Sequence, residues 1–285
     1  MIQNLLNAVV LGSTYSLIAI GLTMVYGILK ILHIAHAGVY TLGAYIGLYA
    51  LYAFDNNFWI ALVLAMLATG IAGVLIYRGM YYYMLKESRI VPLISSIGLF
   101  IALQELFRLF AGPYQKAFPA KSGFPRVETS WFSLTSAQGL IIVLTAVSFL
   151  ALYLIIGKTK IGLGWQVCEQ DIDMAGAMGV NVNRSIALNF FISSMLAGAA
   201  GVLMALYRNS VYPTMGAMVS YKAFVVVVLG GFGNVTGCIV AGLLLAFVET
   251  FLGHLEWFEF PRDAIAFLVL ISVLIFRPKG LFGRK

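Results

Sequence analysis

Two histidines near the start of the chain are the first side chains to consider for chemistry. His33 and His36 lie three residues apart, a spacing that could place both on one helix face, as metal ligands sometimes are. No acidic residue or cysteine lies near them in the sequence, whereas a metal site needs further ligands. We therefore expect them to be polar residues at a helix break, and a metalloenzyme built on them is the most distant alternative.

Other chemistry-bearing patterns are few. Glu105 and Arg108 lie three residues apart and can form an ion pair on one helix face. The sequence has no phosphate-binding loop, potassium-channel filter sequence or repeated-arginine voltage sensor. It also shows no well-separated acidic residues buried in mid-span, which argues against a proton-coupled carrier. We expect a chain that is not an enzyme and that holds no metal or cofactor of its own.

Composition sets the class of protein that must carry these residues. Of 285 residues, 61% are apolar and only 10% are charged, whereas soluble domains carry about 25% charged residues. Apolar runs of 18 or more residues favour transmembrane helices over the shorter alternating strands of a membrane barrel. The excess of 18 Lys and Arg over 11 Asp and Glu lies at span ends, where it meets lipid headgroups rather than nucleic acid. The sequence predicts an all-α integral membrane protein.

The apolar runs predict eight or nine transmembrane helices in a single membrane domain that covers residues 1–285, two of them interrupted. Small residues four apart, Gly12 with Ser16 and Ala197 with Gly201, predict faces where helices pack closely. Cys168 and Cys238 are the only cysteines, and we expect no disulfide between them. The expected spans cover about 5–29, 39–54, 58–77, 91–111, 140–157, 185–207, 223–229, 238–252 and 263–276.

One of the few long hydrophilic passages, residues 158–184, lies between two of these spans. Lys158, Lys160 and Arg184 bracket it, and the chain ends in the basic segment RPKGLFGRK. Cytoplasmic segments are rich in Lys and Arg, so we place this loop and the C-terminus in the cytoplasm and the N-terminus outside.

The middle of this loop has the pattern of a short helix. Glu169 and Asp171 precede Met174 and Ala175, and acidic residues suit a helix's first turn. Gly179 suits its C-terminal end. The helix either inserts its apolar side into a groove on a partner or rests on its own bundle, and the pattern alone favours neither.

Two interruptions occur in corresponding places of the two halves. HIAHAG at residues 33–38 lies between two apolar runs, and LGGFGNVTG at residues 229–237 does so later in the chain. Paired interruptions are typical of inverted repeats with a substrate path near the membrane midplane. Helix packing is the alternative role for the glycines. The residues expected on the path from the second interruption are Gly230, Gly231, Gly233 and Asn234.

Several longer motifs are distributed along nearly the whole chain. They are GSTYSLIAIGLTMVYG at 12–27, AHAGVYTLGAY at 35–45, LISSIGLFIALQ at 93–104, D-x-x-M-A-x-x-M-G-V at 171–180, KAFVVVVLGGFGNVTG at 222–237 and RPKGLFGR at 277–284. Together these segments resemble the permease subunits of branched-chain amino acid ABC transporters, in particular the smaller of the two membrane subunits. At the first break that family usually has Asn-Phe-Ala-His-Gly, whereas this chain has His-Ile-Ala-His-Ala at residues 33–37.

The resemblance implies a subunit of an importer in the bacterial inner membrane. Its expected partners are a homologous second permease, two ATP-binding subunits that bind the ATP, and a periplasmic substrate-binding protein, with leucine, isoleucine or valine as cargo. The 158–184 loop then resembles the helix that couples to the ATPases, with the residues Glu169, Asp171, Met174, Ala175 and Gly179. Tyr15 and His36 join the glycine break as expected path residues.

Three alternatives to this function stay open on the sequence. A related importer of urea or short amides is the nearest, and a stand-alone channel or secondary carrier comes next. A metalloenzyme is the third.

Overall fold

The computed structural model describes residues 2–85, 87–120, 123, 125, 127–129, 132–252, 262–277 and 280–283. Helices dominate these residues. They are α1 (Ile2–Leu29), α2 (His36–Ala53), α3 (Phe58–Ile76), a π-helical turn (Tyr77–Tyr81), α4 (Tyr82–Met84), α5 (Ile90–Ala111), α6 (Ser136–Lys158), α7 (Lys160–Gln170), α8 (Ile172–Ala177), α9 (Val182–Arg208), α10 (Met215–Gly230), α11 (Val235–Leu252) and α12 (Arg262–Phe276).

Short strands occur only in connections of the described chain. Strand β1 (Lys116–Ala117) pairs antiparallel with β4 (Ser210–Val211), and β2 (Val127–Thr129) pairs with β3 (Phe132–Leu134). The expected helical architecture is therefore confirmed for the bundle, while these connections add two small antiparallel pairs.

Six helices are long and apolar enough to cross a membrane: α1, the continuous helix Phe58–Met84, α5, α6, α9 and α11. This number comes from the described residues. Helices α10 and α12 are apolar but shorter. Helix α10 begins eight residues before the predicted apolar run, because its polar residues, including Lys222, are held inside the bundle rather than exposed to lipid. The chain is a multi-pass α-helical membrane protein.

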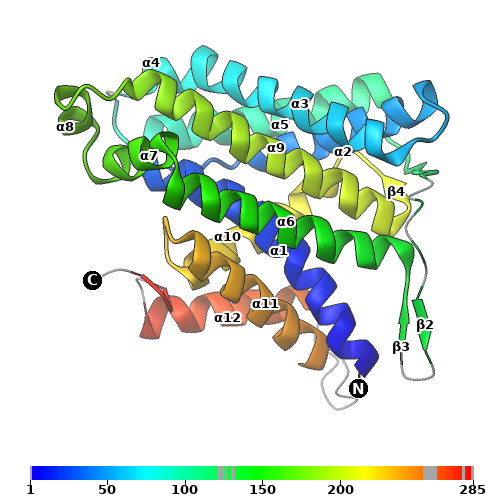
Figure 1. Ribbon diagram of the computed structural model, residues 1–285. Helices are drawn as coiled ribbons and strands as arrows, with labels where there is room; N and C mark the ends of the chain where they lie inside the picture. The colour runs from blue at the N-terminus through cyan, green and yellow to red at the C-terminus, as the bar shows by residue number, and fades with distance from the viewer. Residues whose placement is uncertain are drawn as a thin grey trace.

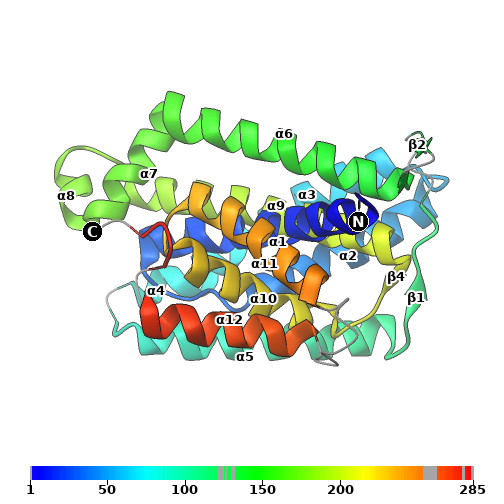
Figure 2. The same ribbon diagram turned by 90° about the horizontal axis from the view of Figure 1, so that it is seen from below.

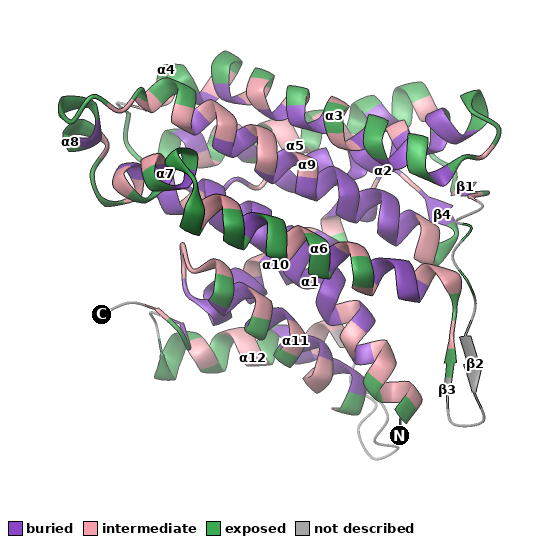
Figure 3. Cartoon of the chain, viewed as in Figure 1, coloured by how far each residue is buried: buried purple, intermediate pink, exposed green. Residues whose placement is uncertain are grey.

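Helix α1 lies at the centre of the bundle and contacts α6, α9, α10 and α11 (Figures 1 and 2). In its central 18-residue window 89% of residues are buried, against 17% for α5. Figure 3 shows the same contrast, with long buried stretches on α1 and α9 and many exposed residues on α6 and α12. Polar side chains on α1 are therefore enclosed by protein, where they can form a site.

The two ends of the bundle carry different parts of the chain. The N-terminus, β2 and β3 lie at one end, while α7, α8 and the C-terminus lie at the other (Figure 1). We call these the N-terminal end and the loop end of the bundle.

Small residues let the central helices approach closely, as their spacing predicts. A β-carbon on Gly12 would lie 2.8 Å from the Cα atom of Leu243 on α11. Ser16, one turn on, donates a hydrogen bond of 3.1 Å to the carbonyl oxygen of Ile239. On α9, a β-carbon on Gly201 would collide with the carbonyl oxygen of Tyr40 on α2. The backbone-to-backbone approach therefore depends on glycine at these positions.

The substitution Gly201→Ala is expected to destabilise the fold by about 1–3 kcal/mol, because the added methyl group must push α2 and α9 apart. The matched control is Gly98→Ala on α5, where a β-carbon would meet nothing within 4 Å. Thermal unfolding of the purified protein in detergent measures both. Equal unfolding midpoints for the two variants would contradict the close α2–α9 packing.

Candidate functional site

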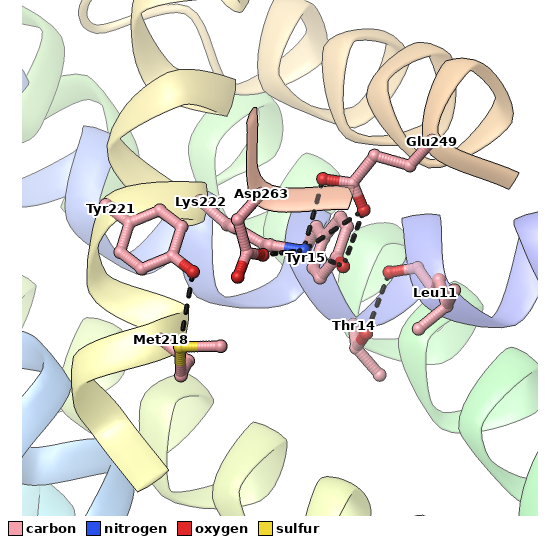
Figure 4. A network of polar contacts seen from close by, with 8 residues as sticks. All are labelled: Leu11, Thr14, Tyr15, Met218, Tyr221, Lys222, Glu249 and Asp263. Atoms are coloured by element: carbon pink, nitrogen blue, oxygen red, sulfur yellow. Dashed lines mark hydrogen bonds and ion pairs between the residues drawn. The ribbon is translucent and has the colours of Figure 1, made fainter. Parts of the chain in front are cut away.

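A group of charged side chains lies inside the bundle between α1, α10, α11 and the start of α12 (Figure 4). The Lys222 ammonium donates to the Tyr15 hydroxyl oxygen at 3.1 Å and lies 3.1 and 3.2 Å from the two carboxylate oxygens of Glu249. It also lies 3.1 Å from Oδ1 of Asp263. The Tyr15 hydroxyl donates in turn to Glu249 at 3.0 Å. We call Tyr15, Lys222, Glu249 and Asp263 the lysine cluster.

The lysine cluster contains one cation and two carboxylates. The side chain of Glu249 is 1% exposed and that of Lys222 is 11% exposed, whereas Asp263 is 38% exposed. Charges inside a membrane bundle persist only when they are paired and hydrogen-bonded, and they commonly mark functional sites. The cluster is therefore the strongest candidate site among the described residues.

The sequence argument, which found no well-separated acidic residues buried in mid-span, missed this cluster and the buried carboxylate of Glu249 near the end of α11. Glu249 is buried because α11 packs antiparallel to α1 and carries this residue back to the level of Tyr15. The available signal was a single acid inside the expected span 238–252 and a single lysine directly before the apolar run 223–229. Their pairing could not be read from the sequence, because Lys222 and Glu249 are 27 residues apart.

A cavity of about 230 Å³ lies beside the cluster and is lined by Tyr15, Lys222 and Asp263. The other polar residues on its wall include Tyr212 and Arg208, which is the last residue of α9. Its apolar wall consists of Leu11, Met204, Met215, Met218 and Val219.

The two histidines lie at the break between α1 and α2. The expectation that they lie at a helix break is confirmed: His33 precedes α2 and His36 is its first residue, because Lys30 turns the backbone at φ 56°. Their ring centroids are 5.8 Å apart, and the His33 Nδ1 atom lies 2.7 Å from the Tyr81 hydroxyl. Among the described residues no group of three or more His, Cys, Asp or Glu gathers as metal ligands would.

His33 and His36 line a second cavity, of about 320 Å³, which is mostly apolar. Its wall includes Phe100 of α5 and Phe224 of α10. Tyr15 and His36, both expected on one path, therefore line different cavities that share helices α1 and α10.

The glycine break forms the tight turn between α10 and α11 and lines neither of these cavities. Gly231 and Gly233 adopt φ values of 91° and 81°, which favour glycine. The Gly233 amide donates to Thr23 of α1 at 3.0 Å, and the Asn234 side chain donates to the Phe282 carbonyl oxygen at 2.8 Å. A β-carbon on Gly230 would lie 2.6 Å from the amide nitrogen of Cys238. These contacts place the break near the loop end of α1, away from Tyr15.

The loop at residues 158–184 contains two helices, α7 and α8, where the sequence predicted one. Asp171 begins α8, and its carboxylate accepts hydrogen bonds from the amides of Asp173 (2.8 Å) and Met174 (3.0 Å). The predicted stop at Gly179 is confirmed: its φ is 84°, and the next amide, of Val180, donates back to the Ala175 carbonyl. Glu169 belongs to α7 instead of the first turn of α8, because Asp171 is extended (φ −156°) and ends α7.

The two sides of this loop differ. Met174 and Met178 are 58% and 73% exposed, while Ala175 is fully buried beneath them. Glu169 lies on the inner side, since a β-carbon on Gly233 would lie 2.6 Å from its Oε1 atom and one on Gly27 would lie 3.6 Å away. The loop therefore presents apolar side chains outward and a carboxylate toward the glycine break.

A bundle of long apolar helices with charged groups and cavities inside is the architecture of a membrane transport protein. The family model described as "Branched-chain amino acid transport system / permease component" matches residues 4–276. The chain belongs to this family, as the sequence motifs predicted.

Similar chains include the high-affinity branched-chain amino acid transport system permease protein BraD of Pseudomonas aeruginosa, which is 36% identical. The alignment covers 99% of this chain and 96% of BraD. The permease protein LivH of the corresponding system in Escherichia coli K12 is 33% identical, with the same coverage. The autoinducer 2 import system permease protein LsrC of Yersinia enterocolitica is 27% identical over 70% of this chain and 55% of its own length.

Proposed function

We propose that this chain is the membrane-spanning permease subunit of an ATP-driven importer of branched-chain amino acids in the bacterial inner membrane. The observation that carries the proposal is the family match along nearly the whole chain, with relatives named for this transport system. In this role the chain forms half of the translocation path. It is not an enzyme, and it needs no cofactor of its own because partner subunits bind the ATP.

The proposed complex contains a homologous second permease, two ATP-binding subunits and a periplasmic substrate-binding protein. The ATPases dock on residues 158–184, where the exposed Met174 and Met178 offer two apolar anchors. Asp171 and Gly179 shape this surface by beginning and ending α8, and buried Ala175 seats it on the bundle.

Motion of the loop reaches the bundle through Glu169. Its carboxylate lies against Gly233 in the α10–α11 turn and against Gly27 near the end of α1. A shift of α7 on ATP binding therefore acts on the glycine break, and through it on α10, which lines both cavities and carries Lys222. ATP binding can switch the opening of the translocation path from one side of the membrane to the other only if the ATPases bind the loop with different affinity in the outward-open and inward-open states.

The proposed topology has nine segments that enter the membrane: the six long helices together with α2, α10 and α12. The N-terminus lies outside and the loop end faces the cytoplasm. The breaks before α2 and before α11 are the corresponding points of the proposed inverted repeat. We treat residues 1–285 as one membrane domain.

Cysteine labelling tests this orientation. Met178→Cys places a thiol at the loop end of the bundle, and Tyr114→Cys places one at the N-terminal end. Both thiols should be accessible, because Met178 and Tyr114 are 73% and 82% exposed. Native Cys168 and Cys238 are buried and unpaired, and burial raises the pKa of the Cys168 thiol, which slows its reaction. In intact spheroplasts a membrane-impermeant maleimide is expected to label Tyr114→Cys at once and Met178→Cys only after permeabilisation. The reverse pattern would contradict the orientation.

The cargo is tested by competition in proteoliposomes that hold the assembled complex, with ATP inside and the binding protein outside. Uptake of labelled leucine is expected, and excess isoleucine or valine should reduce it while urea or acetamide should not. No leucine uptake, together with ATPase activity stimulated by a binding protein loaded with urea or a short amide, would replace the cargo with that of the alternative importer. This competition is needed because LsrC, a similar chain, is named for the import of a different cargo, autoinducer 2.

A further inference from the structure

We infer that the 230 Å³ cavity beside the lysine cluster is a binding site for the backbone of a free amino acid, with Arg208 and Asp263 as its two charged contacts. The inference rests on the proposed function and names the point in this chain where the cargo is held.

The charges on the cavity wall match a zwitterion. Lys222, Arg208 and Asp263 lie on the wall. Glu249 is not a wall residue but neutralises Lys222 as its buried ion-pair partner, which leaves the positive charge of Arg208 and the negative charge of Asp263 for a ligand. A ligand with no net charge but with separated ammonium and carboxylate groups complements such a balanced site. A ligand with a net charge would leave one sign unpaired in a partly buried setting, which costs free energy.

Two of these charged groups can contact a ligand. Lys222 and Glu249 already hold each other with Tyr15 and are almost fully enclosed. Asp263 is 38% exposed, pairs with Lys222 through Oδ1 and is hydrogen-bonded to Tyr221. Its carboxylate has further lone pairs, which can accept from an α-ammonium group. Arg208 is exposed, forms no ion pair with another described residue, and presents a planar fork that suits an α-carboxylate.

The rest of the wall suits an aliphatic side chain. Leu11, Met204, Met215, Met218 and Val219 form its apolar part, and methionine adapts to branched shapes. Drug-sized ligands occupy pockets of about 300–1,000 Å³, so 230 Å³ fits a smaller molecule. The size and lining together favour one apolar amino acid.

The cavity also lies where delivery from outside would occur. Arg208 ends α9, Met215 begins α10 and Asp263 lies in the first turn of α12, and these helix ends lie toward the N-terminal end of the bundle (Figure 1). In the proposed orientation this end faces the periplasm, so the site is the first that a released amino acid meets.

The test measures ligand binding to the purified complex of this chain with its partner permease and ATPases, without the binding protein. Binding is read from the rise of the thermal unfolding midpoint with ligand concentration. The probes are L-leucine, L-leucinamide, which lacks the carboxylate, and 4-methylpentanoate, which lacks the amine. Leucine is expected to bind about tenfold or more tightly than either analogue, because each analogue loses one charged hydrogen bond.

Two variants separate the contacts. Arg208→Gln is expected to weaken leucine about tenfold while leaving leucinamide unchanged, and Asp263→Asn should weaken leucine while leaving 4-methylpentanoate unchanged. The matched controls are Arg108→Gln and Glu105→Gln, an exposed ion pair on α5, and neither should change any of the three affinities.

Leucine binding that is unaffected by Arg208→Gln and Asp263→Asn would overturn the inference, as would the absence of leucine binding in a complex that still performs ATP-driven leucine uptake. Both outcomes leave the proposed function intact. A wild-type complex without leucine uptake, in contrast, would mean that the proposed function itself has failed.

Discussion

The substitution Lys222→Met is expected to destabilise the protein by about 3–5 kcal/mol, because it removes the only cation from a buried group with two carboxylates. Glu249 would then lose its cation inside the bundle, and the Tyr15 hydroxyl would remain as its hydrogen-bond donor among the described residues. Asp263 would add repulsion from the same side. For a chain of this size the loss corresponds to a fall of about 10 °C in the thermal unfolding midpoint, measured in detergent.

The control is Lys116→Met. Like Lys222, Lys116 lies over a tyrosine ring: its ammonium is 5.5 Å from the Tyr49 ring centroid, and that of Lys222 is 5.2 Å from the Tyr15 centroid. The contact of Lys116 with Tyr49 is exposed, however. Its loss should cost less than about 1 kcal/mol. Asp263→Asn should also be mild, since the Lys222–Glu249 pair persists. Similar midpoints for Lys222→Met and Lys116→Met would show that the lysine cluster does not hold the bundle together.

The double substitution Met174→Glu with Met178→Glu is expected to reduce ATP-driven uptake about thirtyfold. The two methionines together would form one apolar anchor in the ATPase groove, where truncating a central contact costs about 2 kcal/mol, or about thirtyfold. Both side chains are more than half exposed in this chain, so the substitutions should leave its own fold nearly unchanged. Uptake and co-purification of the ATPase subunits are measured on the same preparation.

Leucine at both positions is the matched control, because Met and Leu have similar volume and polarity. The leucine variant should retain uptake and co-purification, and the glutamate variant should lose both. Full uptake in the glutamate variant would mean that the ATPases do not rest on α8.

Local rules predicted much of the fold. Apolar runs placed α5 and α12 within one residue of their observed bounds, since lipid exposure requires continuous apolar sequence. Asp171 and Gly179 marked the ends of α8 because capping depends on a few neighbouring residues. Gly12 and Ser16 predicted the close packing of α1 on another helix, although their partner on α11 came only from the structure.

The candidate site depends on contacts between distant residues, which the sequence does not specify. Tyr15 and Glu249 are 234 residues apart, and only the antiparallel packing of α1 and α11 brings them together. The family resemblance implied that Glu169 belongs to the coupling helix, and the structure places its carboxylate on the inner side of the loop beside Gly233. The side of a helix that faces the bundle follows from tertiary packing, so the cluster and this link could not be predicted.

The central claim is that this chain transports branched-chain amino acids only as part of an ATP-driven complex. The most direct measurement compares labelled leucine uptake in proteoliposomes holding the full complex with uptake in proteoliposomes holding this chain alone, each with and without internal ATP. Uptake is predicted only for the full complex with ATP and the loaded binding protein. Leucine transport by this chain alone, without ATP, would contradict the account and favour a channel or secondary carrier.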